Sequence, residues 1–118
     1  MRIPEEGQLL RIFIGESDRW QGKPLYEAII LKAREMGIAG ATMLRGMMGY
    51  GAASRIHTAR ILRLSEDLPI VVEIVDGAEK IAALLPTIEE MVQEGLVTVE
   101  NVRVLQYRSG QSERTSSD

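Results

Sequence analysis

One basic, glycine-rich stretch, residues 45–60, has the sequence RGMMGYGAASRIHTAR and contains no acidic residue. Its glycines are Gly46, Gly49 and Gly51. Glycine exposes its backbone N–H to an anion and tolerates positive φ. Its arginines are Arg45, Arg55 and Arg60. Guanidinium groups bind phosphate oxygens bidentately. The stretch therefore indicates an anion site, and a solvated bend in the chain is the alternative.

The rest of the chain contains few residues that could form a catalytic site or bind a metal ion. There is no cysteine, and His57 is the one histidine, which makes a poor metal or acid–base site by itself. Glu16 and Asp18 lie with Trp20 in a polar loop. Two carboxylates can perform acid–base work, but they more commonly cap their own loop. We therefore expect no catalytic residue, no metal site and no cofactor.

Composition and charge narrow the class of protein. A chain of 118 residues with 45% hydrophobic residues predicts one folded domain. Residues 45–63 carry +4, so the rest of the chain, with 10 basic and 17 acidic residues, carries −7. An acidic body with few aromatics on its strands argues against nucleic-acid binding. No apolar run reaches the roughly 20 residues that span a bilayer, and no signal peptide is evident, so we expect a cytoplasmic protein.

The first half of the chain must position the basic stretch. Period-two alternation over residues 8–14 predicts a strand with Leu10, Ile12 and Ile14 on one face. Apolar spacing after Pro24 predicts a helix that ends at Gly37. Residues 40–46 look like a second strand that runs into the glycine-rich loop. We expect strand character again at residues 58–64 and a turn at 65–69.

The second half repeats a strand and a helix. Residues 70–75 are the clearest strand, because five of six positions are β-branched. Asp76 is a candidate cap for the helix that follows. Pro86 predicts a kink in this helix, or two short helices that meet near Leu85. Gly95 is expected to end the helical segment. Residues 96–107 predict a last strand.

This order predicts an α+β fold, a ferredoxin-like βαββαβ two-layer sandwich with a long loop after the second strand. We assign residues 1–108 to the domain and residues 109–118 to a disordered tail. The strands are apolar on both faces, because Phe13, Val71, Val75 and Leu105 point away from the expected core. A second copy of the chain is the simplest cover for that face.

Three long runs carry a family resemblance: GESDRWQGKPLYEAI, GATMLRGMMGYGAASRIHTARILRLSEDLPIVVEIVD and EGLVTVENVRVL. They resemble the bacterial family called domain of unknown function 190, within the PII-like superfamily of trimeric regulators. The resemblance implies a homotrimer that binds an adenine nucleotide in clefts between subunits. It also implies a membrane channel or transporter as a partner.

The resemblance assigns residues to two roles. The cleft is lined by the stem of the long loop, called the T-loop, and by arginines on or after the last strand: Arg45, Gly46, Met47, Gly49, Tyr50, Gly51, Arg55, Arg103 and Arg108. The partner contacts the rest of the loop: Met48, Ser54, His57 and Arg60. Residues 92–102 depart from the lysine-rich segment with which PII proteins grip phosphate. A monophosphate, cyclic nucleotide or other anion therefore fits better than a triphosphate.

We thus expect a non-enzymatic, nucleotide-binding regulator for signal transduction. A trimer that binds only partners, without a ligand, is the alternative. An acylphosphatase-like hydrolase is a weaker one, because that chemistry needs an asparagine to orient water. The chain's one asparagine, Asn101, lies in the last expected strand.

Overall fold

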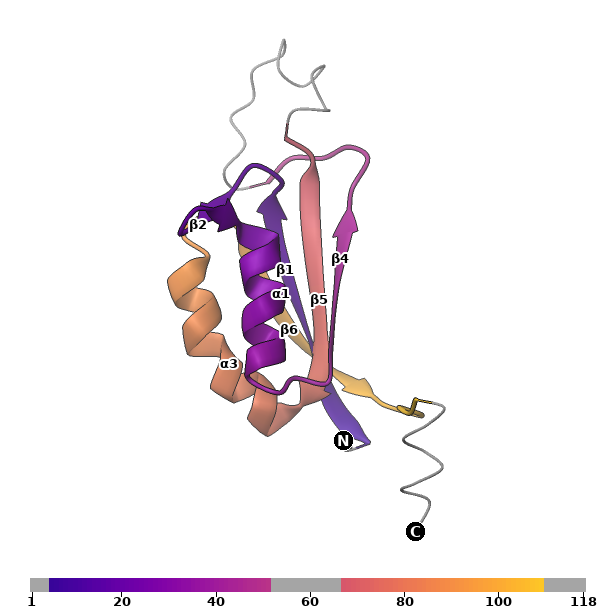
Figure 1. The fold of residues 1–118 in the computed structure, drawn as a ribbon. Helices are drawn as coiled ribbons and strands as arrows, with labels where there is room; N and C mark the ends of the chain where they lie inside the picture. Colours follow the sequence, from indigo (N-terminus) through magenta and orange to yellow (C-terminus); the bar gives the residue numbers. More distant parts are fainter. Residues whose placement is uncertain (1–4, 52–66, 110–118) are drawn as a thin grey trace.

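The computed structural model describes residues 5–51 and 67–109. Four antiparallel strands form one sheet in the order β4-β5-β1-β6, and helices α1 and α3 both lie on one face of it (Figure 1). The strands are β1 (Glu6–Gly15), β4 (Gly40–Arg45), β5 (Pro69–Gly77) and β6 (Leu96–Arg103). The helices are α1 (Leu25–Glu35) and α3 (Ala78–Met91). This confirms the predicted ferredoxin-like α+β sandwich.

The core lies between the helices and one face of the sheet. The faces predicted for β1 and β5 are confirmed, since alternate apolar residues of both strands are fully or almost fully buried. The strands contribute Leu10, Ile12, Ile14, Ile70, Val72 and Ile74. The helices contribute Leu25, Ala28, Ile29, Ala33, Ile81, Leu84, Ile88 and Met91. Burying one such large side chain stabilises the fold by about 1.5–3 kcal/mol.

The pairing of β1 with β5 is the longest in the sheet. It runs without interruption from Gly7 opposite Gly77 to Gly15 opposite Pro69. β4 then pairs with the outer side of β5, and β6 with the outer side of β1. The end of β1 therefore lies beside both ends of the segment that joins β4 to β5.

Helix α1 ends as the sequence predicts. Gly37 has a φ of +76°, and its N–H donates to the carbonyl of Arg34 while the N–H of Ile38 donates to that of Ala33. This pair of bonds is the Schellman arrangement that stops a helix at glycine.

Asp76 does not cap α3, which corrects the sequence prediction. The residue at the helix N-terminus is Gly77, and no side chain caps it. The carboxylate of Asp76 is buried and accepts the N–H of Ala39 at 2.9 Å and that of Gly77 at 2.6 Å. Asp76 therefore fastens the turn between α1 and β4 to the end of β5.

Pro86 does not divide the second helix, so the expectation of two short helices is wrong. Helix α3 runs from Ala78 to Met91 with Pro86 inside it. Pro86 and Ala82, four residues earlier, are both exposed. Water can therefore satisfy the Ala82 carbonyl that loses its N–H donor.

Two further boundaries differ from the predictions. The helix ends at Met91, before Gly95, and a Cβ on Gly95 would lie 2.6 Å from the carbonyl oxygen of Phe13. Gly95 therefore lets the chain pass β1 closely. Strand β6 ends at Arg103 instead of Tyr107, because its partner β1 begins at Glu6, opposite Arg103.

The polar loop after β1 contains a small hairpin that the sequence analysis missed, β2 (Arg19–Trp20) paired with β3 (Lys23–Pro24). Its two turn residues, Gln21 and Gly22, both have positive φ, as a tight hairpin turn requires. The strand character expected at residues 58–64 and the tail at 110–118 lie outside the described residues. Among the described residues, no helix has the length and apolar character needed to cross a membrane.

We predict that Asp76→Ala lowers the free energy of unfolding by about 1–3 kcal/mol, because it leaves buried N–H groups without an acceptor. Urea unfolding measures the change. Glu89→Ala, at an exposed position of α3, is the control and should change stability by less than about 0.5 kcal/mol. Equal stability of the two variants would contradict the anchoring role of Asp76.

Candidate functional site

The two ends of the connection between β4 and β5 meet beside the end of β1. We call this region, residues 15–18, 45–51 and 67–69, the loop base. The N–H of Gly46 donates to the carbonyl of Pro69 at 2.7 Å, and the N–H of Glu16 donates to that of Leu68 at 2.9 Å. The N–H of Ser17 donates to the carboxylate of Asp67 at 3.0 Å. Hydrogen bonds from main-chain N–H groups therefore hold the loop base together.

Arg45, the first residue of the predicted anion site, is already paired. Its Nη2 lies 2.5 Å from Oε2 of Glu16. The Arg45 side chain remains 49% exposed, and that of Glu16 is 26% exposed. The guanidinium is therefore reachable from solvent on the side that Glu16 does not cover.

Gly46 is required by a close approach of two chain segments. A Cβ at this position would lie 2.8 Å from Cγ of Pro69, a distance that real side chains do not tolerate. A Cβ at Gly51 would meet open space, with no heavy atom within 4 Å. Close packing therefore requires a glycine at position 46, whereas position 51 has room for a side chain.

The start of the loop presents large apolar side chains to solvent. Met47 is 89% exposed, Tyr50 77% and Met48 70%. Met43, by contrast, packs against the core, which is the role expected of a methionine at a strand end. Flexible thioethers adapt to differently shaped partners, so these side chains suit a contact surface.

The described part of the loop base is less basic than the sequence suggested. It carries one guanidinium, at Arg45, and three carboxylates, at Glu16, Asp18 and Asp67. Asp18 accepts the N–H of Gly15 at 2.9 Å, which confirms that it caps its own loop. The sequence offered Glu16 only as a possible acid–base group and did not connect Glu16 or Asp67 with Arg45, since these residues come from segments distant in the chain.

Two of the predicted ligand residues lie at the far end of the sheet. Arg45 pairs in register with Ile70 and so lies near Ile14 of β1, whereas Arg103 lies opposite Glu6. Eight residues of extended strand separate these positions, about 27 Å. Arg103 Nε contacts Glu5 at 3.0 Å, and Arg108 follows the strand in an exposed position. One chain therefore does not bring Arg45 and Arg103 to a single small ligand.

Four other predicted residues, Ser54, Arg55, His57 and Arg60, lie outside the described residues. Within residues 5–51 and 67–109, no group of three or more histidine, cysteine, aspartate or glutamate side chains is placed to hold a metal ion.

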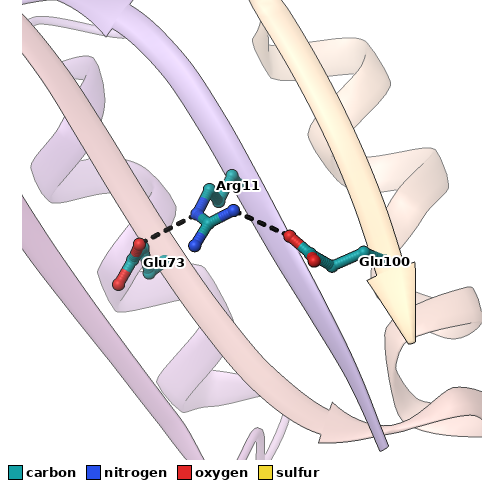
Figure 2. Close-up of polar contacts among 3 residues, drawn as sticks. All are labelled: Arg11, Glu73 and Glu100. Atoms are coloured by element: carbon teal, nitrogen blue, oxygen red, sulfur yellow. Dashed lines mark hydrogen bonds and ion pairs between the residues drawn. The ribbon is translucent and has the colours of Figure 1, made fainter. Parts of the chain in front are cut away.

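Among residues 5–51 and 67–109, no helix covers the sheet face opposite α1 and α3, which we call the open face. At its centre Arg11 bridges two neighbouring strands, with Nε 2.9 Å from Glu73 of β5 and Nη1 2.7 Å from Glu100 of β6 (Figure 2). The hydrogen bond to Glu73 and the charge of Glu100 raise the pKa of Arg11 above its ordinary value, although partial desolvation opposes them. The open face therefore carries its charges as an internally paired network.

Apolar side chains surround this network. On the side nearer the loop base, a row of paired residues crosses all four strands: Leu44, Val71, Phe13 and Leu96. Leu44 is 48% exposed, Leu96 54% and Phe13 37%. Contiguous apolar surface of this kind marks an interaction site on a small protein.

A separate hollow of about 370 Å³ lies in the helical layer. Trp20 and Lys23 of the hairpin line it together with residues of α1 and Met91 of α3. Arg45 and the other loop-base residues do not line it. The hollow is therefore distinct from the predicted anion site, and it is where Trp20 packs against the core.

Solved structures identify the class of fold. The chain is similar to CPII from Thiomonas intermedia K12, bound to ADP, AMP and acetate, with a TM-score of 0.62 at 16% identity, covering 86% of this chain and 90% of that one. A putative PII-like signaling protein from Thermus thermophilus gives 0.56 at 20% identity, covering 84% and 89%. The fold is therefore that of the PII-like proteins.

The chain belongs to the family DUF190, described as uncharacterized ACR, whose profile matches residues 7–104. A UPF0166 protein of Aquifex aeolicus (strain VF5) is 40% identical over 105 residues, covering 89% of this chain and 98% of the relative. A UPF0166 protein of Methanocaldococcus jannaschii is 33% identical over 100 residues, covering 84% and 92%. The family resemblance inferred from the sequence is confirmed.

We predict that Gly46→Ala destabilises the protein by about 1–3 kcal/mol, because the new methyl group forces Pro69 away and weakens the bond to its carbonyl. Thermal unfolding measures the loss. Gly51→Ala is the matched control in the same segment and should leave the melting temperature nearly unchanged. If both variants melt together with the wild type, Gly46 has only a flexibility role.

Proposed function

We propose that this protein is a non-enzymatic, PII-like homotrimeric regulator that binds a small anion, an adenine nucleotide, at clefts between subunits. The observation that carries the proposal is the loop base. It presents a half-exposed guanidinium at Arg45 on a preformed backbone frame. The similar CPII structures contain ADP, one with AMP and acetate and another with bicarbonate, which supports a nucleotide or small anion as the ligand class.

A site between subunits agrees with the distribution of cations. Arg45 and Arg103 occupy opposite ends of the sheet, so one ligand reaches both only if they come from different chains. We propose that Arg108, Arg55 and the stem residues up to Gly51 also line this ligand site. The acidic loop base favours a ligand of low charge over a triphosphate.

The open sheet face supports the trimer. It presents an apolar row beside a charge network that is already paired, and such a face is costly to leave in water. Covering it with two further copies of the chain removes this apolar surface from solvent. Both carboxylates of the Arg11 network contact the guanidinium, so the network enters the interface with a net charge of −1 instead of the −2 of two unpaired carboxylates, which reduces the desolvation cost.

Regulation would pass through the loop. Ligand binding would order the segment after Gly46 and change the surface formed by Met47, Met48 and Tyr50. A ligand shifts such an equilibrium only by its difference in affinity for the two loop states. The partner that we propose is a membrane channel or transporter. This protein, a cytoplasmic regulator, contacts that partner through its own Met-rich loop, which includes Ser54, His57 and Arg60.

The two alternatives make different demands on the structure. A ligand-free trimer needs only the open face and the loop. An acylphosphatase-like hydrolase needs an asparagine beside the anion site, yet Asn101 lies in β6 and its Oδ1 accepts the side-chain amide of Gln8 at 3.2 Å, near the far end of the sheet from Arg45. This geometry favours a regulator over a hydrolase.

We predict that Leu44→Glu converts the protein from a trimer into monomers, because it places a charge in the apolar row of the open face. Light scattering coupled to size exclusion should give three times the chain mass of 13.1 kDa for the wild type and the chain mass itself for the variant. Leu31→Glu is the matched control, since Leu31 is 47% exposed on α1, in the helical layer. A monomeric wild type, or a trimeric Leu44→Glu, contradicts the assembly.

We predict that Arg45→Gln weakens ADP and AMP binding about tenfold or more, the usual effect of losing a charge-assisted hydrogen bond. Titration calorimetry measures the affinity, and the ligand-induced rise in melting temperature should shrink in parallel. Arg34→Gln, at an exposed position of α1, is the charge-matched control. Wild-type protein that binds neither nucleotide would favour the partner-only trimer.

A further inference from the structure

We infer that Glu16 occupies the anion position at Arg45 in the ligand-free protein and is displaced when an anionic ligand binds. This inference rests on the proposed function, because it concerns the same site. It assigns to Glu16, a residue outside the predicted ligand set, the role of setting the affinity and specificity of that site.

The contact places one anionic oxygen at the guanidinium of Arg45. Oε2 of Glu16 lies 2.5 Å from Nη2 of Arg45, at the start of the loop. A carboxylate presents two oxygens to a guanidinium, as a phosphoryl group or a bicarbonate ion does. Glu16 therefore acts as an internal substitute for the ligand's anionic group.

Glu16 is held in this position by its backbone. Its own N–H donates to Leu68, and the N–H of its neighbour Ser17 donates to Asp67. On the other side, the N–H of Gly15 donates to Asp18. The backbone of Glu16 is therefore fixed by main-chain N–H groups, whereas its carboxylate contacts the side chain of Arg45.

Among the three carboxylates of the loop base, Glu16 is the one suited to exchange. Asp18 and Asp67 accept main-chain N–H groups that shape the loop, so moving either would disturb the backbone. Glu16 contacts a side chain instead, and a partly exposed ion pair of this kind contributes little to stability. A ligand therefore displaces Glu16 at small cost and leaves the frame intact.

Displacement of the Glu16 carboxylate from Arg45 affects which ligands bind and how the start of the loop is held. A ligand must bring an anionic group that replaces the carboxylate at Arg45, so an uncharged nucleoside gains nothing from the exchange. Release of Glu16 also removes the side-chain link between the end of β1 and the start of the loop. Ligand binding and loop rearrangement are thereby coupled through one ion pair.

A thermodynamic cycle with Glu16→Gln, Arg45→Gln and the double variant tests the inference. In calorimetric titrations with AMP, Glu16→Gln should bind about three- to tenfold more tightly than the wild type, because competition at Arg45 is removed. In the Arg45→Gln background the same change should have no effect. Glu27→Gln, at an exposed position of α1, controls for net charge and should bind AMP as the wild type does.

A ligand-free measurement keeps the two proposals apart. In urea unfolding the cycle should show coupling between Glu16 and Arg45, about two- to fivefold in the unfolding equilibrium constant. If the wild type binds AMP and Glu16→Gln binds it equally well or more weakly, the inference about Glu16 is wrong while the proposed function stands. An absence of coupling between Glu16 and Arg45 in urea unfolding has the same meaning. If neither the wild type nor any variant binds AMP or ADP, the proposed function falls and takes the inference with it.

Discussion

The antiparallel pairing of β1 with β5 is the constraint on which the rest of the structure depends. The register from Gly7–Gly77 to Gly15–Pro69 places the end of β1 beside the start of β5. At that end it brings Glu16 to Leu68 and allows Arg45 of β4 to reach Glu16. At the other end of β5 the pairing with β4 sets Gly40 opposite Val75, which brings the N–H of Ala39 to the carboxylate of Asp76. A shift of one residue would turn every core side chain of β1 to the wrong face.

The same pairing contributes to a sheet with two apolar faces, and both helices of the described part of the chain lie on one of them. The helices cover the face of Ile12 and Val72, while the face of Phe13 and Val71 stays open (Figure 1). The Arg11 network on the open face joins three strands through side chains (Figure 2). One guanidinium contacts two carboxylates, so the network keeps a net charge of −1. Assembly and ligand binding are linked in the proposed function, since Arg45 and Arg103 lie at opposite ends of the sheet and reach one ligand only from different chains.

Particular residues show how far the sequence could be followed. The period-two pattern of β1 and β5 predicted both faces of the sheet, and Gly37 predicted the end of α1, because these signals depend on residues a few positions apart. Of the two outcomes predicted at Pro86, the division into two short helices is wrong, because the cost of proline in a helix depends on whether water reaches the freed carbonyl. The capping role predicted for Asp76 was also wrong, since its carboxylate accepts the N–H of Ala39, which lies 37 positions earlier in the chain. The hairpin at Trp20 was missed because its strands have two residues each.

The sequence by itself determined the alternation of elements, the family, the two apolar faces and the presence of a basic, glycine-rich loop. These follow from local periodicity and composition, which the order of residues contains directly. Only the tertiary structure decided which groups meet at the loop base. It paired Arg45 with Glu16, surrounded the site with carboxylates, and moved Arg103 to the far end of the sheet. Such contacts depend on strand register between segments distant in the chain, and a small change in register would give each charge a different neighbour.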